Sequence, residues 1–199
     1  MKTFALMAMC VCALAAGAAA RQAGAPAGGQ APAPPTSVAA EVNGFYTRIA
    51  GFIVQSAEMV PADKYTWAAT PEVRSYARLF AHITDDNNGA CWQSAGLAER
   101  PATVDARAGE TAWAADKMSK ADLQKGLADS VALCEKAFKA VTPANMMEIP
   151  GGRGTRTRIG SLIYNTSHIN EHYGNLVTYL RLNGIVPPSS APRGGGPAY

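Results

Sequence analysis

The sequence lacks the marks of several protein classes. Its formal net charge is only +3 and it contains no run of basic residues, so a nucleic-acid partner is not expected. Beyond the N-terminus there is no stretch of about 18 uncharged apolar residues, so no transmembrane helix is expected in the rest of the chain. Runs of alternating polarity are few and no internal repeat is found, which disfavours sheet and repeat architectures.

The composition that remains favours a helical protein with a packed core. Hydrophobic residues make up 48% of the 199 residues and charged residues 17%, which is too apolar for a disordered chain. Aromatic and β-branched residues are modest in number while alanine is abundant, and alanine favours helices. The length predicts one domain.

The first twenty residues have the pattern of a signal peptide. Lys2 gives a positive start, Phe4 to Leu14 form an apolar run of about eleven residues, and small residues follow up to Ala20. We predict a signal peptide over residues 1–20 that exports the protein to the periplasm or the medium. We expect no stable membrane insertion after cleavage.

Two segments of low complexity flank the predicted domain. Residues 21–37 are rich in alanine, glycine and proline and are expected to form a linker. Residues 187–199 are similar and are expected to form a flexible tail. The domain itself is predicted to span residues 38–186.

Apolar residues at helical spacing predict four long helices in this domain. They cover about 38–60, 70–97, 119–142 and 155–183. Thr70 and Pro71 form a start signal for the second, Ser119 caps the third, and Asn183-Gly184 ends the fourth. Four amphipathic helices predict an all-α four-helix bundle. The segment 98–118 is long enough to be a crossover connection.

The chain contains only three histidines, and their placement indicates a metal site. His168 and His172 are four residues apart, about 40° from each other around one helix. His82 lies near the middle of another helix. Three imidazoles with an open coordination position form a known kind of reactive metal centre.

Polar residues near the histidines are candidates to orient the imidazoles. On a helical wheel Asn165, Asn175 and Tyr179 fall within about 60° of His168. Asp86 lies one turn after His82 and could orient an imidazole or complete the coordination shell. The alternative is that the histidines are merely solvated or hydrogen-bonded. A zinc peptidase of the H-x-x-E-H type is disfavoured, because no acidic residue follows Glu171.

Two further groups of residues leave alternatives open. Cys91 and Cys134 lie on the apolar faces of their helices, as two buried thiols or as a disulfide, and export favours the disulfide. Arg153, Arg156 and Arg158 surround a glycine-rich loop. They are either solvated or able to receive an anionic substrate if the loop folds over the metal.

Four segments of the chain resemble the DinB-like family, namely Leu79–Asn87, Asn165–Ser189, Pro61–Tyr65 and Thr70–Ser75. The resemblance extends over about residues 40–186. It implies a four-helix bundle that binds a divalent metal, often zinc or nickel. The family's ligands, one from the second helix and an H-x3-H pair from the fourth, map onto His82, His168 and His172. It also implies relatives that are thiol-dependent transferases or isomerases, and many that are homodimers.

Together these patterns predict an exported, metal-dependent transferase or hydrolase with a small-molecule substrate. Two alternatives remain open from the sequence. One is a metal-binding module without catalytic activity. The other is a helical bundle that pairs with a partner and whose histidines are incidental.

Overall fold

The computed structural model describes residues 36–104, 114–152 and 155–191. The predicted signal peptide and all but the last two residues of the predicted linker lie outside this range. The same is true of Arg153 and of residues 192–199.

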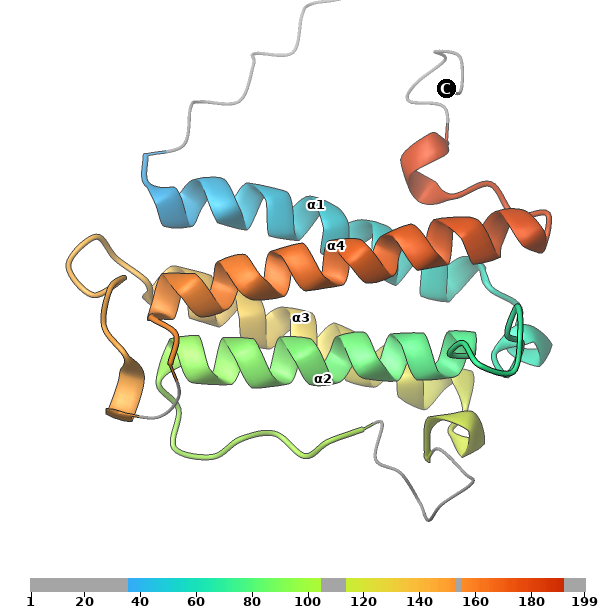
Figure 1. Cartoon of the computed structure of the whole chain (residues 1–199), viewed down its shortest axis with the longest axis horizontal. Helices are drawn as coiled ribbons and strands as arrows, with labels where there is room; N and C mark the ends of the chain where they lie inside the picture. Colours follow the sequence, from blue (N-terminus) through green and yellow to red (C-terminus); the bar gives the residue numbers. More distant parts are fainter. Residues whose placement is uncertain (1–35, 105–113, 153–154, 192–199) are drawn as a thin grey trace, which may run out of the picture. The chain divides into compact units, whose positions relative to one another are not determined.

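Four long helices make up the described domain (Figure 1), and no strand occurs among the described residues. They are α1 (Val38–Met59), α2 (Tyr76–Ala95), α3 (Lys120–Ala140) and α4 (Arg158–Leu182). Short 3-10 helices lie between and after them, namely η1 (Ala62–Lys64), η2 (Ala114–Lys117), η3 (Pro150–Gly152) and η4 (Pro188–Ser190). The prediction of an all-α four-helix bundle is confirmed. No described helix is both long and apolar enough to cross a membrane.

A hydroxyl side chain caps the N-terminus of each long helix. The caps are Ser37, Ser75, Ser119 and Thr157, and each accepts a hydrogen bond from the backbone N–H three residues further on. Such caps satisfy a backbone donor that has no partner within the helix.

The predicted start of α2 at Thr70 is wrong, because the helix begins at Tyr76. The backbone N–H of Tyr76 donates to the carbonyl of Trp67 at 3.1 Å, and that of Ala77 donates to the carbonyl of Tyr65 at 2.8 Å. These bonds direct the first N–H groups of α2 to an earlier loop. A helix that began at Thr70 would direct the same groups to its own carbonyls.

Contacts between the helices establish their directions. Three contacts follow one another in the same order along α2 and α3. Thr84 lies against Gly126, Asn87 donates to Ser130, and Cys91 is bonded to Cys134, so these two helices are parallel. α4 is antiparallel to α2 (Figure 1). Because α2 and α3 are parallel, the chain that joins them has to cover the length of the bundle. The segment 98–118 is long enough for this.

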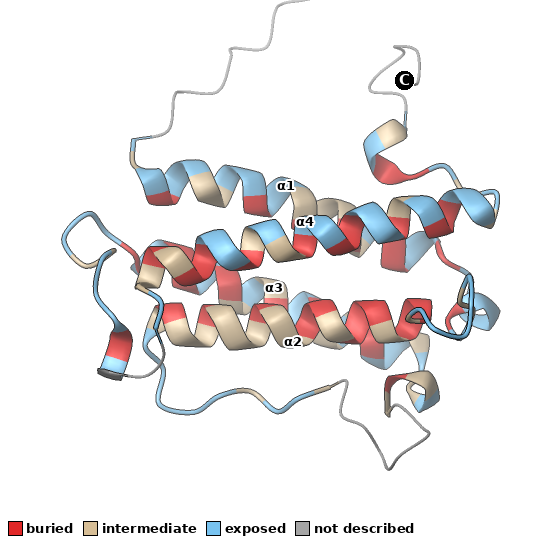
Figure 2. Ribbon diagram, in the orientation of Figure 1, coloured by how far each residue is buried: buried red, intermediate tan, exposed pale blue. Residues whose placement is uncertain are grey.

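Buried residues occur on all four long helices (Figure 2), and the apolar ones among them form the core. Its largest fully buried aliphatic and aromatic members include Tyr46, Ile53, Phe80, Ile83, Leu123, Leu127, Leu162, Ile169, Leu176 and Leu180. Burial of each such side chain contributes roughly 1.5–3 kcal/mol to folding. The core thereby fixes the positions of α2 and α4 relative to each other.

Cys91 of α2 and Cys134 of α3 form a disulfide, with their Cα atoms 4.9 Å apart. Both cysteines are fully buried. Of the two alternatives that the sequence leaves open for these thiols, the structure contains the covalent one.

The packed domain extends beyond residue 186, where the sequence predicts a flexible tail. Pro188 of η4 is buried, and the backbone N–H of Ser189 donates to the hydroxyl of Tyr173 at 3.0 Å. The first residues of the predicted tail are thus held against α4, because a tyrosine of that helix binds their backbone.

Candidate metal centre

Two helices bring four potential metal ligands together. His82 and Asp86 lie on α2, and His168 and His172 lie on α4. One nitrogen or oxygen of each side chain lies within 4.8 Å of those of the other three. Because the pairs are four residues apart on antiparallel helices, each helix presents both members of its pair on one face. This set of four residues is called the histidine cluster below.

Short contacts join the members of the histidine cluster. Oδ2 of Asp86 lies 3.3 Å from Nε2 of His82 and 3.3 Å from Nδ1 of His168. Nε2 of His168 lies 3.1 Å from Nε2 of His172. The ring centres of His82 and His172 are 4.7 Å apart, nearly perpendicular to each other. All three imidazoles therefore approach a common centre from two helices.

Burial keeps two of the imidazoles neutral. It lowers the pKa of His82 to about 4, with added effects of Arg74 and of the two other histidines. It likewise lowers the pKa of His172 to about 4, helped by His168 and Arg74. A neutral imidazole has a lone pair available for a metal, whereas a protonated one has none.

Burial also shifts the pKa of the Asp86 carboxyl group, in the opposite direction to that of the imidazoles. Burial raises its pKa to about 6, and the nearby His168 lowers it in part. The group is therefore mostly ionised at neutral pH, and an anionic oxygen is available beside two imidazoles.

The polar atoms of the histidine cluster fit a divalent metal. The 3.3 Å contacts of Asp86 with His82 and His168 lack hydrogen-bond geometry, so Oδ2 of Asp86 and Nδ1 of His168 are buried without a hydrogen-bond partner in the described structure. Buried polar atoms without partners are costly, and a bound cation would satisfy both of them. A set of imidazole nitrogens with one carboxylate oxygen is typical of sites for zinc, nickel and related ions. The histidine cluster could thus hold a metal ion.

Of the residues predicted to orient the imidazoles, Asp86 and Asn175 lie at the histidine cluster. Asp86 contacts two histidines directly, as described above. Nδ2 of Asn175 lies 3.4 Å from Nδ1 of His172, the ring nitrogen that faces away from His168. A contact at that nitrogen can fix the ring's orientation.

The other two predicted residues, Asn165 and Tyr179, have different partners. The amide of Asn165 donates to Oδ1 of Asn87 at 2.9 Å inside the core. The hydroxyl of Tyr179 donates to the backbone carbonyl of Arg74 at 3.0 Å. The helical wheel places both on the side of His168, but each lies opposite a different part of the bundle.

The sequence analysis did not single out Arg74 as a residue of the site. Its charge helps to lower the pKa of both His82 and His172. Arg74 precedes α2, and its backbone carbonyl accepts a hydrogen bond from the hydroxyl of Tyr179 on α4. No spacing rule places a residue in such a turn, so the sequence carried no signal for it.

Comparison with known proteins agrees with this architecture. No curated protein matches the chain. A family model described as the DinB superfamily matches residues 53–176, which include the whole histidine cluster and most of the bundle. On the strength of that match and of the four-helix fold, this chain belongs to the DinB superfamily.

Proposed function

We propose that this protein is an exported metal-dependent enzyme, a transferase or hydrolase of a small molecule. Zinc or nickel is the proposed ion, with His82, His168 and His172 as its ligands. The observation that carries the proposal is the convergence of four ligand atoms from two helices within 4.8 Å. Solvated histidines on separate helices have no reason to converge in this way.

The chemistry of such an ion supports the proposed reaction class. A divalent metal with an open coordination position lowers the pKa of a bound water or thiol, or polarises a substrate oxygen. Around it, Asp86 supplies a negative charge between two imidazoles. Asn175 contacts the outer nitrogen of His172 and limits its rotation.

Two features support export. The sequence begins with the pattern of a signal peptide. The bundle contains a buried disulfide, and disulfides of this kind persist in oxidising compartments such as the periplasm.

Metal analysis of the mature protein tests the proposed ligands. We expect about one equivalent of zinc or nickel in protein prepared without a histidine tag, and loss of most of it in His168→Ala and His82→Ala. Glu171→Ala is the matched control, because this exposed residue lies on α4 between two histidines and outside the histidine cluster. Unchanged metal content in His168→Ala would contradict the proposed ligand set.

A second experiment separates an enzyme from a metal-binding module. The metal-loaded protein is incubated with activated esters and with electrophiles in the presence of thiols. We expect turnover that is lost on chelation and in His168→Ala. Stoichiometric metal without metal-dependent turnover would favour the module.

A further inference from the structure

A polar pocket of about 230 Å³ adjoins the histidine cluster between α2 and α4. Asp86, which belongs to the histidine cluster, also lines this pocket. Tyr164 also lines the pocket, and its ring centre lies 5.4 Å from that of His168. The pocket is therefore a continuation of the proposed metal site toward the N-terminus of α4.

Two arginines from different segments line this pocket. The guanidinium of Arg156 lies over the ring of Tyr164, 3.9 Å from the ring centre. Arg100 reaches the pocket from the segment after α2, and its guanidinium lies against Gly89. A Cβ atom at position 89 would lie 3.1 Å from Nη2 of Arg100. The absence of a side chain there gives the guanidinium room beside the helix.

Local contacts position the segment of Arg100 and the side chain of Arg156. Oδ1 of Asp85 accepts a hydrogen bond from the backbone N–H of Val104 at 2.7 Å, which attaches the segment of Arg100 to α2. Stacking on Tyr164 orients Arg156. Among the described residues, neither guanidinium forms an ion pair with a carboxylate. Both remain available to a ligand.

Neutral donors in the pocket wall also lack partners. Ser161 is 1% exposed, and its hydroxyl has no hydrogen-bond partner in the described structure. The same holds for the indole nitrogen of Trp92. Both residues line the pocket. Four residues whose side chains can donate hydrogen bonds therefore line one pocket, and its two guanidinium groups suit the oxygen atoms of an anion.

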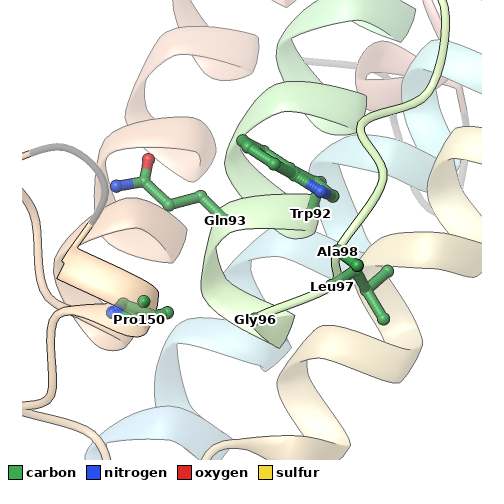
Figure 3. A pocket seen from close by; sticks show the side chains of 7 residues that line it. Trp92, Gln93, Gly96, Leu97, Ala98 and Pro150 are labelled. Atoms are coloured by element: carbon green, nitrogen blue, oxygen red, sulfur yellow. The ribbon is translucent and has the colours of Figure 1, made fainter.

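The neighbouring pocket at the end of α2 differs in charge. It measures about 240 Å³, and Trp92 and Gln93 are among the residues that line it (Figure 3). Both residues also line the first pocket. The other described lining residues of the neighbouring pocket, which include Leu97 and Pro150, carry no charge. Arg100 and Arg156, which line the first pocket, do not line this one. In the first pocket the two guanidinium groups and a divalent ion would outweigh the charge of Asp85 and Asp86.

We propose that this pocket binds the carboxylate end of a small acidic substrate whose other end reaches the metal. This rests on the proposed metal-dependent function and adds the class of substrate to it. Ser161 lies two helical turns, or about 10 Å, from His168 along α4. The expected ligand is therefore a short chain with an acidic group at one end and a metal-binding group at the other.

Binding of simple dicarboxylates tests this assignment. Calorimetry on the metal-loaded mature protein compares glutarate and adipate with valerate and hexanoate, which lack the second carboxylate. We expect the dicarboxylates to bind about tenfold more tightly, since one charged hydrogen-bonded contact is worth this much. The double variant Arg100→Gln/Arg156→Gln should lose this advantage. Arg48→Gln, an exposed arginine of α1 outside the pocket, should keep it.

Metal content is measured on the same samples, so that the two proposals can fail separately. Full metal loading with no dicarboxylate advantage in the wild type would overturn the pocket assignment alone. An advantage that persists in the double arginine variant would do the same, because the anion would then bind the metal without the pocket. A wild-type protein that binds no metal would overturn the proposed function as well.

Discussion

At the scale of single residues, Asp86 links the two halves of the histidine cluster. One of its oxygens lies 3.3 Å from an imidazole of α2 and 3.3 Å from an imidazole of α4. A carboxylate in this position either binds the ion itself or holds the imidazoles in the orientation that binds it. Both roles require its negative charge.

The variant Asp86→Asn removes that charge with almost no change in shape. We expect metal affinity to fall by about 10–100-fold, the usual loss when a group that supports metal ligands is altered. Competition against a chelating dye measures the affinity. Asp129→Asn is the control, because Asp129 pairs only with the exposed Lys125 in the described structure. Equal affinity in both variants would show that Asp86 has no part in the site.

The sequence predicts the histidines of this site better than their polar neighbours. His168 and His172 share a helix face by spacing alone, and their rarity draws attention to His82. The wheel also selects Asn165, yet this side chain binds Asn87 in the core. A helical angle gives the direction of a side chain and not the element that lies opposite it. The latter depends on how the helices pack.

At the scale of elements, the cap of α2 has a second partner that the cap of α1 lacks. Oγ of Ser75 accepts from the N–H of Arg78 and also donates to Oδ1 of Asp116 at 2.5 Å. Ser75 therefore joins the start of α2 to η2. Oγ of Ser37 accepts only from the N–H of Ala40 in the described structure.

The pair Ser75→Ala and Ser37→Ala measures this difference. Loss of a cap costs about 1 kcal/mol of unfolding free energy. Ser75→Ala should cost roughly 1 kcal/mol more than Ser37→Ala, because it also leaves Asp116 without its hydrogen bond. Urea denaturation provides both values. Equal losses would mean that the bond between Ser75 and Asp116 contributes nothing to stability.

The disulfide fixes the parallel pair of α2 and α3. It joins Cys91 and Cys134, which are 43 positions apart in the sequence. In the chain-entropy model such a crosslink stabilises the fold by roughly 3–4 kcal/mol. Cys91→Ala/Cys134→Ala should lose about this much in urea denaturation. The same variant should be insensitive to dithiothreitol, whereas the wild type should be destabilised by it. A wild type that is equally stable with and without reductant would argue against the crosslink.

Helix boundaries illustrate what local signals can and cannot establish. The cap at Ser119 is predicted correctly because a serine followed by an acidic first turn is sufficient there. Thr70, Pro71 and Glu72 give an equally good local signal, yet α2 begins at Tyr76. Carbonyls of Tyr65 and Trp67 bind the first N–H groups of that helix. Such bonds between segments leave no trace in a helical pattern.

At the scale of the whole molecule, the direction of the helices determines the site. α2 and α4 are antiparallel, which places His82 opposite His168 and His172. The length of segment 98–118 allows a crossover, but only the contacts between α2 and α3 show that one is made. The number of helices could therefore be predicted from the sequence, whereas their order in space could not.

Export is also a property of the whole chain, and it can be tested directly. The full-length protein, produced in a Gram-negative bacterium, should be recovered from the periplasm or the medium with Arg21 as its first residue. A chain that lacks residues 2–20 should remain in the cytoplasm. N-terminal sequencing of the fractions gives the result. Recovery of the full-length chain in the cytoplasm, with residues 1–20 intact, would contradict the predicted signal peptide.

The central claim is that one ion is bound jointly by imidazoles of α2 and α4. X-ray absorption spectroscopy of the metal-loaded mature protein tests it most directly, because scattering from imidazole rings reveals how many of them bind the ion. The wild type should show three imidazoles, and His82→Ala should show one fewer. A wild-type spectrum without coordinated imidazole, or one that is unchanged in His82→Ala, would contradict the claim.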